Sequence, residues 1–291
     1  MIDCIKSEIK TFYYSRVLWI GLLVILVIPL YFQITTCQQL QDVAINQVET
    51  YEEVNASGDE CDLSDLVITI QEMHKTFHPQ TSINNSLAVM IGLGMLGFPA
   101  LFSVFAGKEY RRYTIKPKIV YFSLLKVFVA KVLVAMACLL GFLMIYSCIC
   151  YVVMKMCWEK YLMGIFDSSS IQFEVFRFTM FKNMELLFLV FTILMFFTFF
   201  CMLASFVFKS SVAGIIATIV FNYLTLPTKY SPHHIFYNFI NRSFYQSSVS
   251  VFEFKENMDA TLSSRVGIVV LSLYLLVGVV ALLVLGKTQK N

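Results

Sequence analysis

Long runs of apolar residues alternate along the chain with polar stretches. Most of the six runs are close to 20 residues long, the length at which an α-helix crosses a hydrocarbon core of about 30 Å. The pattern predicts an all-α integral membrane protein in which residues 1–291 form a single transmembrane domain. The six predicted spans are 17–35, 87–106, 124–153, 186–208, 212–226 and 266–286. The third run is longer than one bilayer, which favours a helix that tilts or projects.

The N-terminal residues predict an additional helix that does not cross the membrane. Their apolar side chains fall within about 100° of a helical wheel. These side chains are Ile2, Ile5, Ile9, Phe12 and Tyr13, with Lys6 and Lys10 beside them. This pattern is typical of an interfacial helix, expected over residues 1–16, which lies along the inner membrane surface before the chain turns into the first span.

The segments between the spans differ in character. Residues 36–86 and 154–185 are expected outside the cell, and the first of these segments is polar and acidic. Within it, apolar residues at helical spacing predict a helix over 64–77. Residues 227–265 are rich in aromatic side chains and too apolar for a plain solvent loop, which favours short re-entrant or interfacial helices before the sixth span. Three residues, 209–211, separate the fourth and fifth spans and predict a tight turn.

Charge gives the predicted spans a direction. Only 14% of the residues are charged, against about 25% in soluble domains, and Lys and Arg are densest in the loop 107–123. Because basic residues concentrate on the cytoplasmic side of membrane proteins, this distribution predicts that both termini lie inside. The net charge of +3 is too small to indicate a nucleic-acid partner.

The eight cysteines are too few and too scattered for a disulfide scaffold. Four of them lie in apolar runs, where Cys packs as a small hydrophobic side chain. Cys37 and Cys61 flank a hydrophilic stretch and would form a disulfide if that stretch faces an oxidising space.

Metal-binding residues are sparse. His74 and His78 are four residues apart, which on a helix places them on one face. A zinc-protease helix needs Glu directly after its first His, and this chain has Lys75 there. We therefore expect a solvated helix face and no metal site.

Catalytic motifs are also missing from the sequence pattern. Gly286-Lys287-Thr288 resembles the end of a phosphate-binding loop, but Ala281 stands where that loop needs its first glycine. The chain is therefore not expected to be an enzyme or to bind a cofactor itself. Asn222 is the most polar residue inside the predicted spans, and it would either line a translocation route or form an interhelical hydrogen bond.

A family resemblance lies in the loop after the second span. Residues 105–118 read Phe-Ala-Gly-Lys-Glu-Tyr-Arg-Arg-Tyr-Thr-Ile-Lys-Pro-Lys, and Lys126 and Lys131 begin the next span. This segment resembles the corresponding loop of ABC-2-type permeases (type-2 ABC exporters), which often read Gly-Glu-x-x-x-Gly-Thr-Leu-Lys. Here Lys108 intervenes before the glutamate, and Tyr113 replaces the second glycine. The resemblance covers about residues 100–135 in sequence and nearly the whole chain in layout, which is similar to that of lantibiotic or peptide exporter and immunity permeases.

The resemblance implies a coupling helix in the inner loop that docks on a separate ATPase chain. Glu109, Arg111, Arg112 and Thr114 would lie at or near that contact. The alternative is a basic loop that only sets the topology.

The function implied is that of a permease subunit in the bacterial plasma membrane. It would move an amphipathic peptide or another hydrophobic substrate out of the cell, for bacteriocin (antimicrobial peptide) export or self-immunity. Its partners would be ABC ATPase subunits that bind ATP and Mg, a second permease subunit of the same or a sister chain, and the lipid bilayer. The alternative function is a non-transporting membrane sensor or assembly protein that binds a partner through its acidic extracellular loop.

Overall fold

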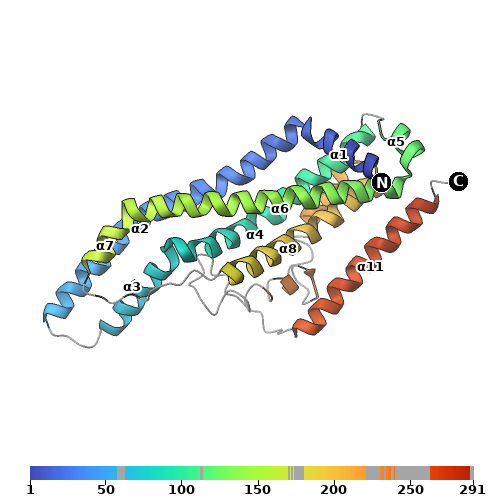
Figure 1. The fold of residues 1–291 in the computed structure, drawn as a ribbon. Coiled ribbons are helices and arrows are strands. Elements are labelled where there is room, and N and C mark those ends of the chain that lie inside the picture. The colour runs from blue at the N-terminus through green and yellow to red at the C-terminus, as the bar shows by residue number, and fades with distance from the viewer. Residues whose placement is uncertain are drawn as a thin grey trace.

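The computed structural model consists of helices packed along a common direction (Figure 1). It describes residues 1–57, 63–111, 114–169, 171, 173, 180–220, 230–232, 234–236, 239 and 263–288, and no β-strand occurs among them. The elements are α1 (Ile2–Tyr13), α2 (Arg16–Ser57), α3 (Leu63–Phe77), α4 (Pro79–Arg111), α5 (Ile115–Phe122), α6 (Leu124–Cys157), the π-helical turn η1 (Trp158–Leu162), α7 (Met163–Ser168), α8 (Met180–Val207), α9 (Ser211–Ile219) and α11 (Ser264–Thr288). The all-α prediction is confirmed for this part of the chain.

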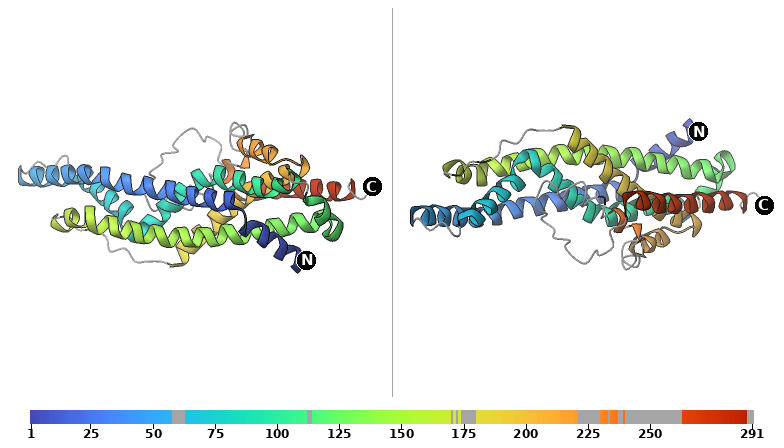
Figure 2. Two further views of the ribbon diagram at one scale, coloured as in Figure 1. Left: turned by 90° about the horizontal axis from the view of Figure 1, so that it is seen from above. Right: turned by 90° about the horizontal axis from the view of Figure 1, so that it is seen from below.

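Five helices within the described ranges have the length and apolar composition needed to cross a membrane. They cover residues 16–56, 81–110, 124–168, 184–207 and 265–284, and each overlaps one predicted span. Within the remaining predicted span, 212–226, the structure describes α9. Residues 221–229 lie outside the described residues, so this span stays a prediction. Figures 1 and 2 show that α11 ends near α5, and Phe206 of α8 contacts Tyr110 beside α5. The chain therefore returns toward the other end between α8 and α11, and α9 begins that return.

Two helical rods are far longer than a membrane requires. α2 has 42 residues, and α6, η1 and α7 form one continuous rod of 45 residues. At 1.5 Å per residue each exceeds about 60 Å, roughly twice the thickness of a hydrocarbon core. Beyond the bundle they run beside α3 (Figure 1). The segments 36–86 and 154–185 are thus helical over much of their length, and the predicted helix 64–77 is confirmed as α3.

A separate small core joins these extended helices at the α3 end of the molecule. Its buried side chains come from α2, α3, η1 and α7. We call them the distal core: Ala44, Val48, Ile70, Trp158, Leu162 and Phe166. The end opposite to it, where α1, α5 and the last turn of α11 lie, is called the α5 end (Figure 1).

Helices α4, α8 and α9 form the most closely packed part of the bundle. The predicted tight turn after α8 is confirmed: Lys209 has a positive φ of 54°, and the Ser210 hydroxyl accepts a hydrogen bond from the Val212 N–H at 3.2 Å. Small residues permit this close approach. A Cβ added to Gly107 would collide with the Ser211 backbone, and one added to Gly214 would collide with side chains of α4 and α8.

Gly107→Ala is therefore expected to lower the stability of the bundle by about 1–3 kcal/mol, the usual range for overpacking. The Ser211 backbone would have to move, because it is not the flexible end of a side chain. Gly141→Ala in α6 is the matched control, since nothing outside its own helix lies within 4 Å of the added Cβ. Thermal unfolding in detergent measures both. Equal midpoints for the two variants would contradict the prediction.

The N-terminal helix is present, and only part of its apolar stripe, Ile5 and Phe12, packs against the protein. Cys4, Glu8 and Phe12 are buried, while Ile2 and Tyr13 are mostly exposed. The inward face packs on α6. The exposed side chains of the stripe face away from the protein. That they lie in the inner membrane interface stays a prediction.

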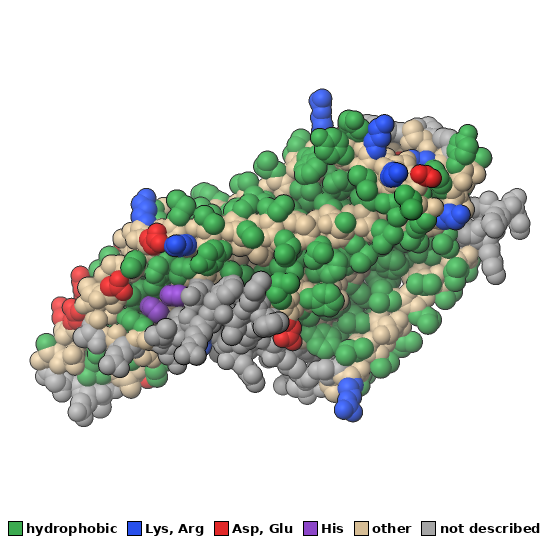
Figure 3. Space-filling model, viewed as in Figure 1, with side chains coloured by type: hydrophobic (Ala, Val, Ile, Leu, Met, Phe, Trp, Pro, Cys, Tyr) green, Lys and Arg blue, Asp and Glu red, His purple; other side chains and the backbone are tan. Residues whose placement is uncertain are grey.

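Charged side chains are unevenly distributed over the surface. In the view of Figure 3, acidic side chains gather at the α3 end and several Lys and Arg side chains near the α5 end, with a largely hydrophobic surface between them. This arrangement suits a membrane protein with water at both ends. Which end faces the cytoplasm stays a prediction.

Candidate functional site

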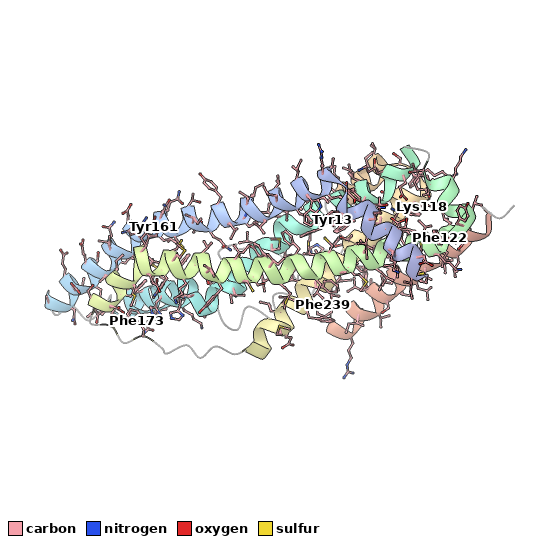
Figure 4. All side chains as sticks on the ribbon, turned by 45° about the horizontal axis from the view of Figure 1, so that its top comes forward. Tyr13, Lys118, Phe122, Tyr161, Phe173 and Phe239 are labelled. Atoms are coloured by element: carbon pink, nitrogen blue, oxygen red, sulfur yellow. The ribbon has the colours of Figure 1, made fainter. Side chains whose placement is uncertain are left out.

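Four charged side chains meet inside the α5 end, each from a different helix. They are Glu8 of α1, Glu109 of α4, Lys118 of α5 and Lys131 of α6. The side chains of Glu8 and Lys131 are fully buried, and those of Glu109 and Lys118 are 6% and 18% exposed. Figure 4 labels Lys118 at this end of the molecule. We call this group the charge cluster.

Each lysine of the charge cluster contacts both carboxylates. Lys118 Nζ lies 2.8 Å from Glu8 Oε1 and also bonds to Glu109 Oε1. Lys131 Nζ lies 2.6 Å from Glu8 Oε2 and 3.1 Å from Glu109 Oε2. Two formal positive and two formal negative charges thus alternate in a closed ring. A buried arrangement of this kind is tolerated only when every charge has its partners.

The position of Glu8 follows from the burial pattern of α1. Cys4, Glu8 and Phe12 are four residues apart and therefore share one helical face. The Cys4 thiol donates to the Lys126 carbonyl at 3.7 Å, and the Phe12 ring packs against Phe105 of α4 at 5.6 Å between centroids. A hydrogen bond to α6 one turn before Glu8 and a ring contact with α4 one turn after it thus hold the Glu8 carboxylate inside the bundle.

Two turns of the backbone place Lys118 over Glu8 and Glu109. The Thr114 N–H donates to the Glu109 carbonyl at 3.1 Å beyond the end of α4. After the eight residues of α5, Ser123 has a positive φ of 63°, and α6 starts at the next residue. α5 is therefore a short element pinned between two spanning helices.

The surroundings favour the charged form of Lys118. Burial opposes the charge on Lys118, but hydrogen bonds to Glu109 and Glu8 outweigh it and raise the pKa of Lys118 above its ordinary value. The Thr11 hydroxyl accepts a further bond from Lys118 at 3.3 Å. Lys131 Nζ also lies 4.2 Å from the centroid of the Phe105 ring, a cation–π contact. These contacts can hold four helix segments in one arrangement.

The residues expected at an ATPase contact do not share one exposed surface. Glu109 is buried in the charge cluster, so it supports α5 from inside rather than lying on the surface. Thr114 is exposed beside α5. Arg112, the side chain of Arg111 and Asn222 lie outside the described residues.

The expected cysteine pair is only half described. Cys61 lies outside the described residues, while Cys37 is fully buried in α2 and contacts α6.

Sequence reasoning missed the charge cluster, although two signals were present. Lys131 interrupts an apolar run inside the predicted third span, and an ionisable residue there needs a partner. Glu8 likewise shares a helical face with Cys4 and Phe12.

The expectation for His74 was wrong. Its ring is 9% exposed and stacks on Phe173 with centroids 4.2 Å apart, at the edge of the distal core. Burial lowers the pKa of His74 to about 4, with His78 acting in the same direction. Within the described ranges no three His, Cys, Asp or Glu side chains are grouped so as to hold a metal ion.

Comparisons with protein-family models, with curated proteins and with solved structures gave no match to this chain. Function must therefore be argued from the helices, the charge cluster and the exposed surfaces. The structure supports a helical, membrane-type architecture with several apolar helices.

Proposed function

We propose that this chain is the permease subunit of an ATP-driven ABC exporter in a bacterial plasma membrane. Its six spanning helices would have both termini in the cytoplasm. ATP and Mg would be bound and used by separate ATPase subunits, and a second permease subunit, identical or a sister chain, would complete the pathway. The substrate proposed is an amphipathic peptide or another hydrophobic molecule, exported as a bacteriocin or removed for self-immunity.

The observation that carries this proposal is the construction of α5. This short helix stands outside the candidate spans, and Lys118 binds its inner side to Glu8 of α1 and Glu109 of α4. Lys131 of α6 pairs with the same two carboxylates. On its outer side Val120 is 83% exposed and Tyr121 is 82% exposed. Exposed apolar side chains rimmed by polar ones are typical of a docking surface. A partner that pushes on α5 would therefore push on three further helices.

We expect Val120→Glu to weaken the association with an ATPase chain by about tenfold or more, equivalent to about 1.4 kcal/mol. The reason is that a charge replaces an apolar contact at the centre of the proposed docking surface. The measurement is affinity purification of the tagged chain from its native membranes, followed by mass spectrometry for co-purified chains with a Gly-x-x-x-x-Gly-Lys-Ser/Thr loop.

Val43→Glu is the matched control, because Val43 is an exposed valine of α2 in the half that leads to the distal core. It should leave the association unchanged. If no chain with such a loop co-purifies with the unaltered protein, the exporter proposal fails. If such a chain co-purifies with the unaltered protein and equally with the Val120→Glu variant, α5 is not the docking element. ATP-dependent peptide uptake into inverted vesicles would then test the substrate class.

One observation favours the second candidate, a sensor or assembly protein. The α3 end has its own core and an acidic surface (Figure 3), which suits a partner with basic groups. The same purification separates the two proposals: the alternative predicts a partner that is lost on Glu-to-Gln changes at this surface and carries no phosphate-binding loop.

A further inference from the structure

We propose that Cys37 and Cys157 form a disulfide that joins α2 to α6 near the point where the two helices leave the membrane. This inference rests on the orientation in the proposed function, which puts the α3 end outside the cell. It changes the partner of Cys37 from the one expected from sequence.

The two cysteines lie in one small buried cluster between α2 and α6. The Cys37 thiol is fully buried and donates a hydrogen bond to Met154 Sδ at 4.0 Å. Met154 and Cys157 are three residues apart on α6, so both lie on the face that α2 packs against. Cys37, Met154 and Cys157 belong to one core cluster, and both thiols are free in the structure.

The polar groups around the pair place it near a water boundary. Cys37 lies two residues beyond the predicted end of the first span at residue 35, and a core of about 30 Å takes about 20 helical residues from Arg16. The next residue, Gln38, donates to the Tyr161 hydroxyl at 3.1 Å. Lys155 of α6 and Glu159 of η1, both exposed, precede and follow Cys157 in the sequence and form an ion pair at 3.8 Å. A thiol pair at this depth on the outer side meets oxidising conditions as the chain folds.

The oxidation would proceed by exchange with an external low-molecular-weight disulfide, R–S–S–R. One cysteine thiolate attacks this disulfide and releases one R–SH, which leaves a mixed disulfide on the protein. The second cysteine thiolate then attacks the protein sulfur and releases another R–SH. The two cysteines lose two electrons, the external disulfide gains them, and the two thiol protons end on the two R–SH molecules.

The consequence is a covalent link across the base of the extended part. α2 and α6 there contact each other through side chains alone. A disulfide would fix their relative sliding without touching the charge cluster at the α5 end. Cys201, a buried cysteine of α8, has no place in this link and serves as the control.

The test is peptide mapping of the full chain from native membranes, quenched in acid, then denatured and alkylated with iodoacetamide at mildly alkaline pH before any reduction. The expected result is a linked peptide pair containing Cys37 and Cys157, which phosphine reduction separates. Cys201→Ser should keep this pair, while Cys37→Ser should leave Cys157 alkylated. Reduction should lower the thermal midpoint of the unaltered protein and not that of Cys37→Ser.

Three results would overturn the proposal: both cysteines fully alkylated without reduction, Cys37 linked to Cys61 instead, or protection removed by a copper(I) chelator rather than by the phosphine. The last result would indicate a soft-metal site of two thiolates and the Met154 thioether. Labelling of Val43→Cys with a membrane-impermeant maleimide in intact cells reports the orientation separately. A labelled Val43→Cys with reduced Cys37 and Cys157 refutes the disulfide alone, whereas an unlabelled one refutes the orientation on which the exporter proposal depends.

Discussion

Lys131→Met should destabilise the protein by about 3–5 kcal/mol, the range found when one partner of a buried ion pair is removed. Lys131 has no exposed surface and contacts both Glu8 and Glu109. Methionine fills a similar volume but leaves two buried carboxylates facing a single ammonium group. The loss should appear as a lower midpoint in denaturant and thermal unfolding of the detergent-solubilised chain.

The double variant Glu8→Gln with Lys131→Met should recover most of this loss. It leaves Glu109 and Lys118 as one neutral pair, and the cycle of single and double variants isolates the interaction energy. Lys155→Met is the matched control on the same helix, because its ion pair with Glu159 is more than half exposed and should contribute less than about 1 kcal/mol. A Lys131→Met variant no less stable than Lys155→Met would show that the charge cluster does not hold the α5 end together.

Acidification should loosen the distal core through His74. Its pKa falls from 6.5 to about 4 because burial disfavours the charged ring. Above pH 6.5 the ring is neutral in both folded and unfolded chains, so pH has no effect through it. Between pH 6.5 and 4 the unfolded chain takes up the proton and the folded chain does not, so stability decreases as pH falls. The total loss reaches roughly 3 kcal/mol near pH 4 and is constant below it.

Trp158 provides a direct readout of this loss, since its ring lies 5.1 Å from that of His74. The chain has two tryptophans, and Trp19→Phe makes Trp158 the sole reporter. Its emission midpoint in denaturant should fall between pH 7 and pH 4.5. In the His74→Phe variant, which keeps an aromatic ring against Phe173, the fall should be smaller, with the remainder coming from His78, whose pKa burial also lowers. An identical fall in both proteins would remove His74 from this role.

Five of the six predicted spans correspond to long apolar helices, because lipid requires an uninterrupted apolar run that the sequence shows directly. The extension of α2 beyond residue 35 was harder to predict, because a helix in water needs only one apolar face. The sequence does contain that face. It consists of residues spaced by seven, four and three positions that line the inner side of α2: Cys37, Ala44, Val48 and Tyr51. Polar composition had suggested a loop where a helical periodicity was present.

The charge cluster could be predicted only in part. A lysine inside an apolar span, such as Lys131, predicts an acidic partner. Which residue is that partner depends on how segments far apart in the sequence pack together. Glu8 is 123 residues away. Lys118 reaches both carboxylates only because the chain reverses at Ser123 with a positive φ, a conformation that serine does not signal. Local pattern cannot specify such pairings.

The rod made of α6, η1 and α7 links the two regions described above, because it carries Lys131 near one end and Trp158 and Phe166 near the other. If the proposed spans are right, such a rod would act as a lever that pivots within the bilayer. A tilt of about 5° over about 40 Å of helix, at 1.5 Å per residue, moves its tip by roughly 3 Å, comparable to the width of a side-chain contact. A small displacement of the helix around Lys131 would therefore produce a larger displacement at the distal core. A force applied to the distal core would likewise be transmitted to α5.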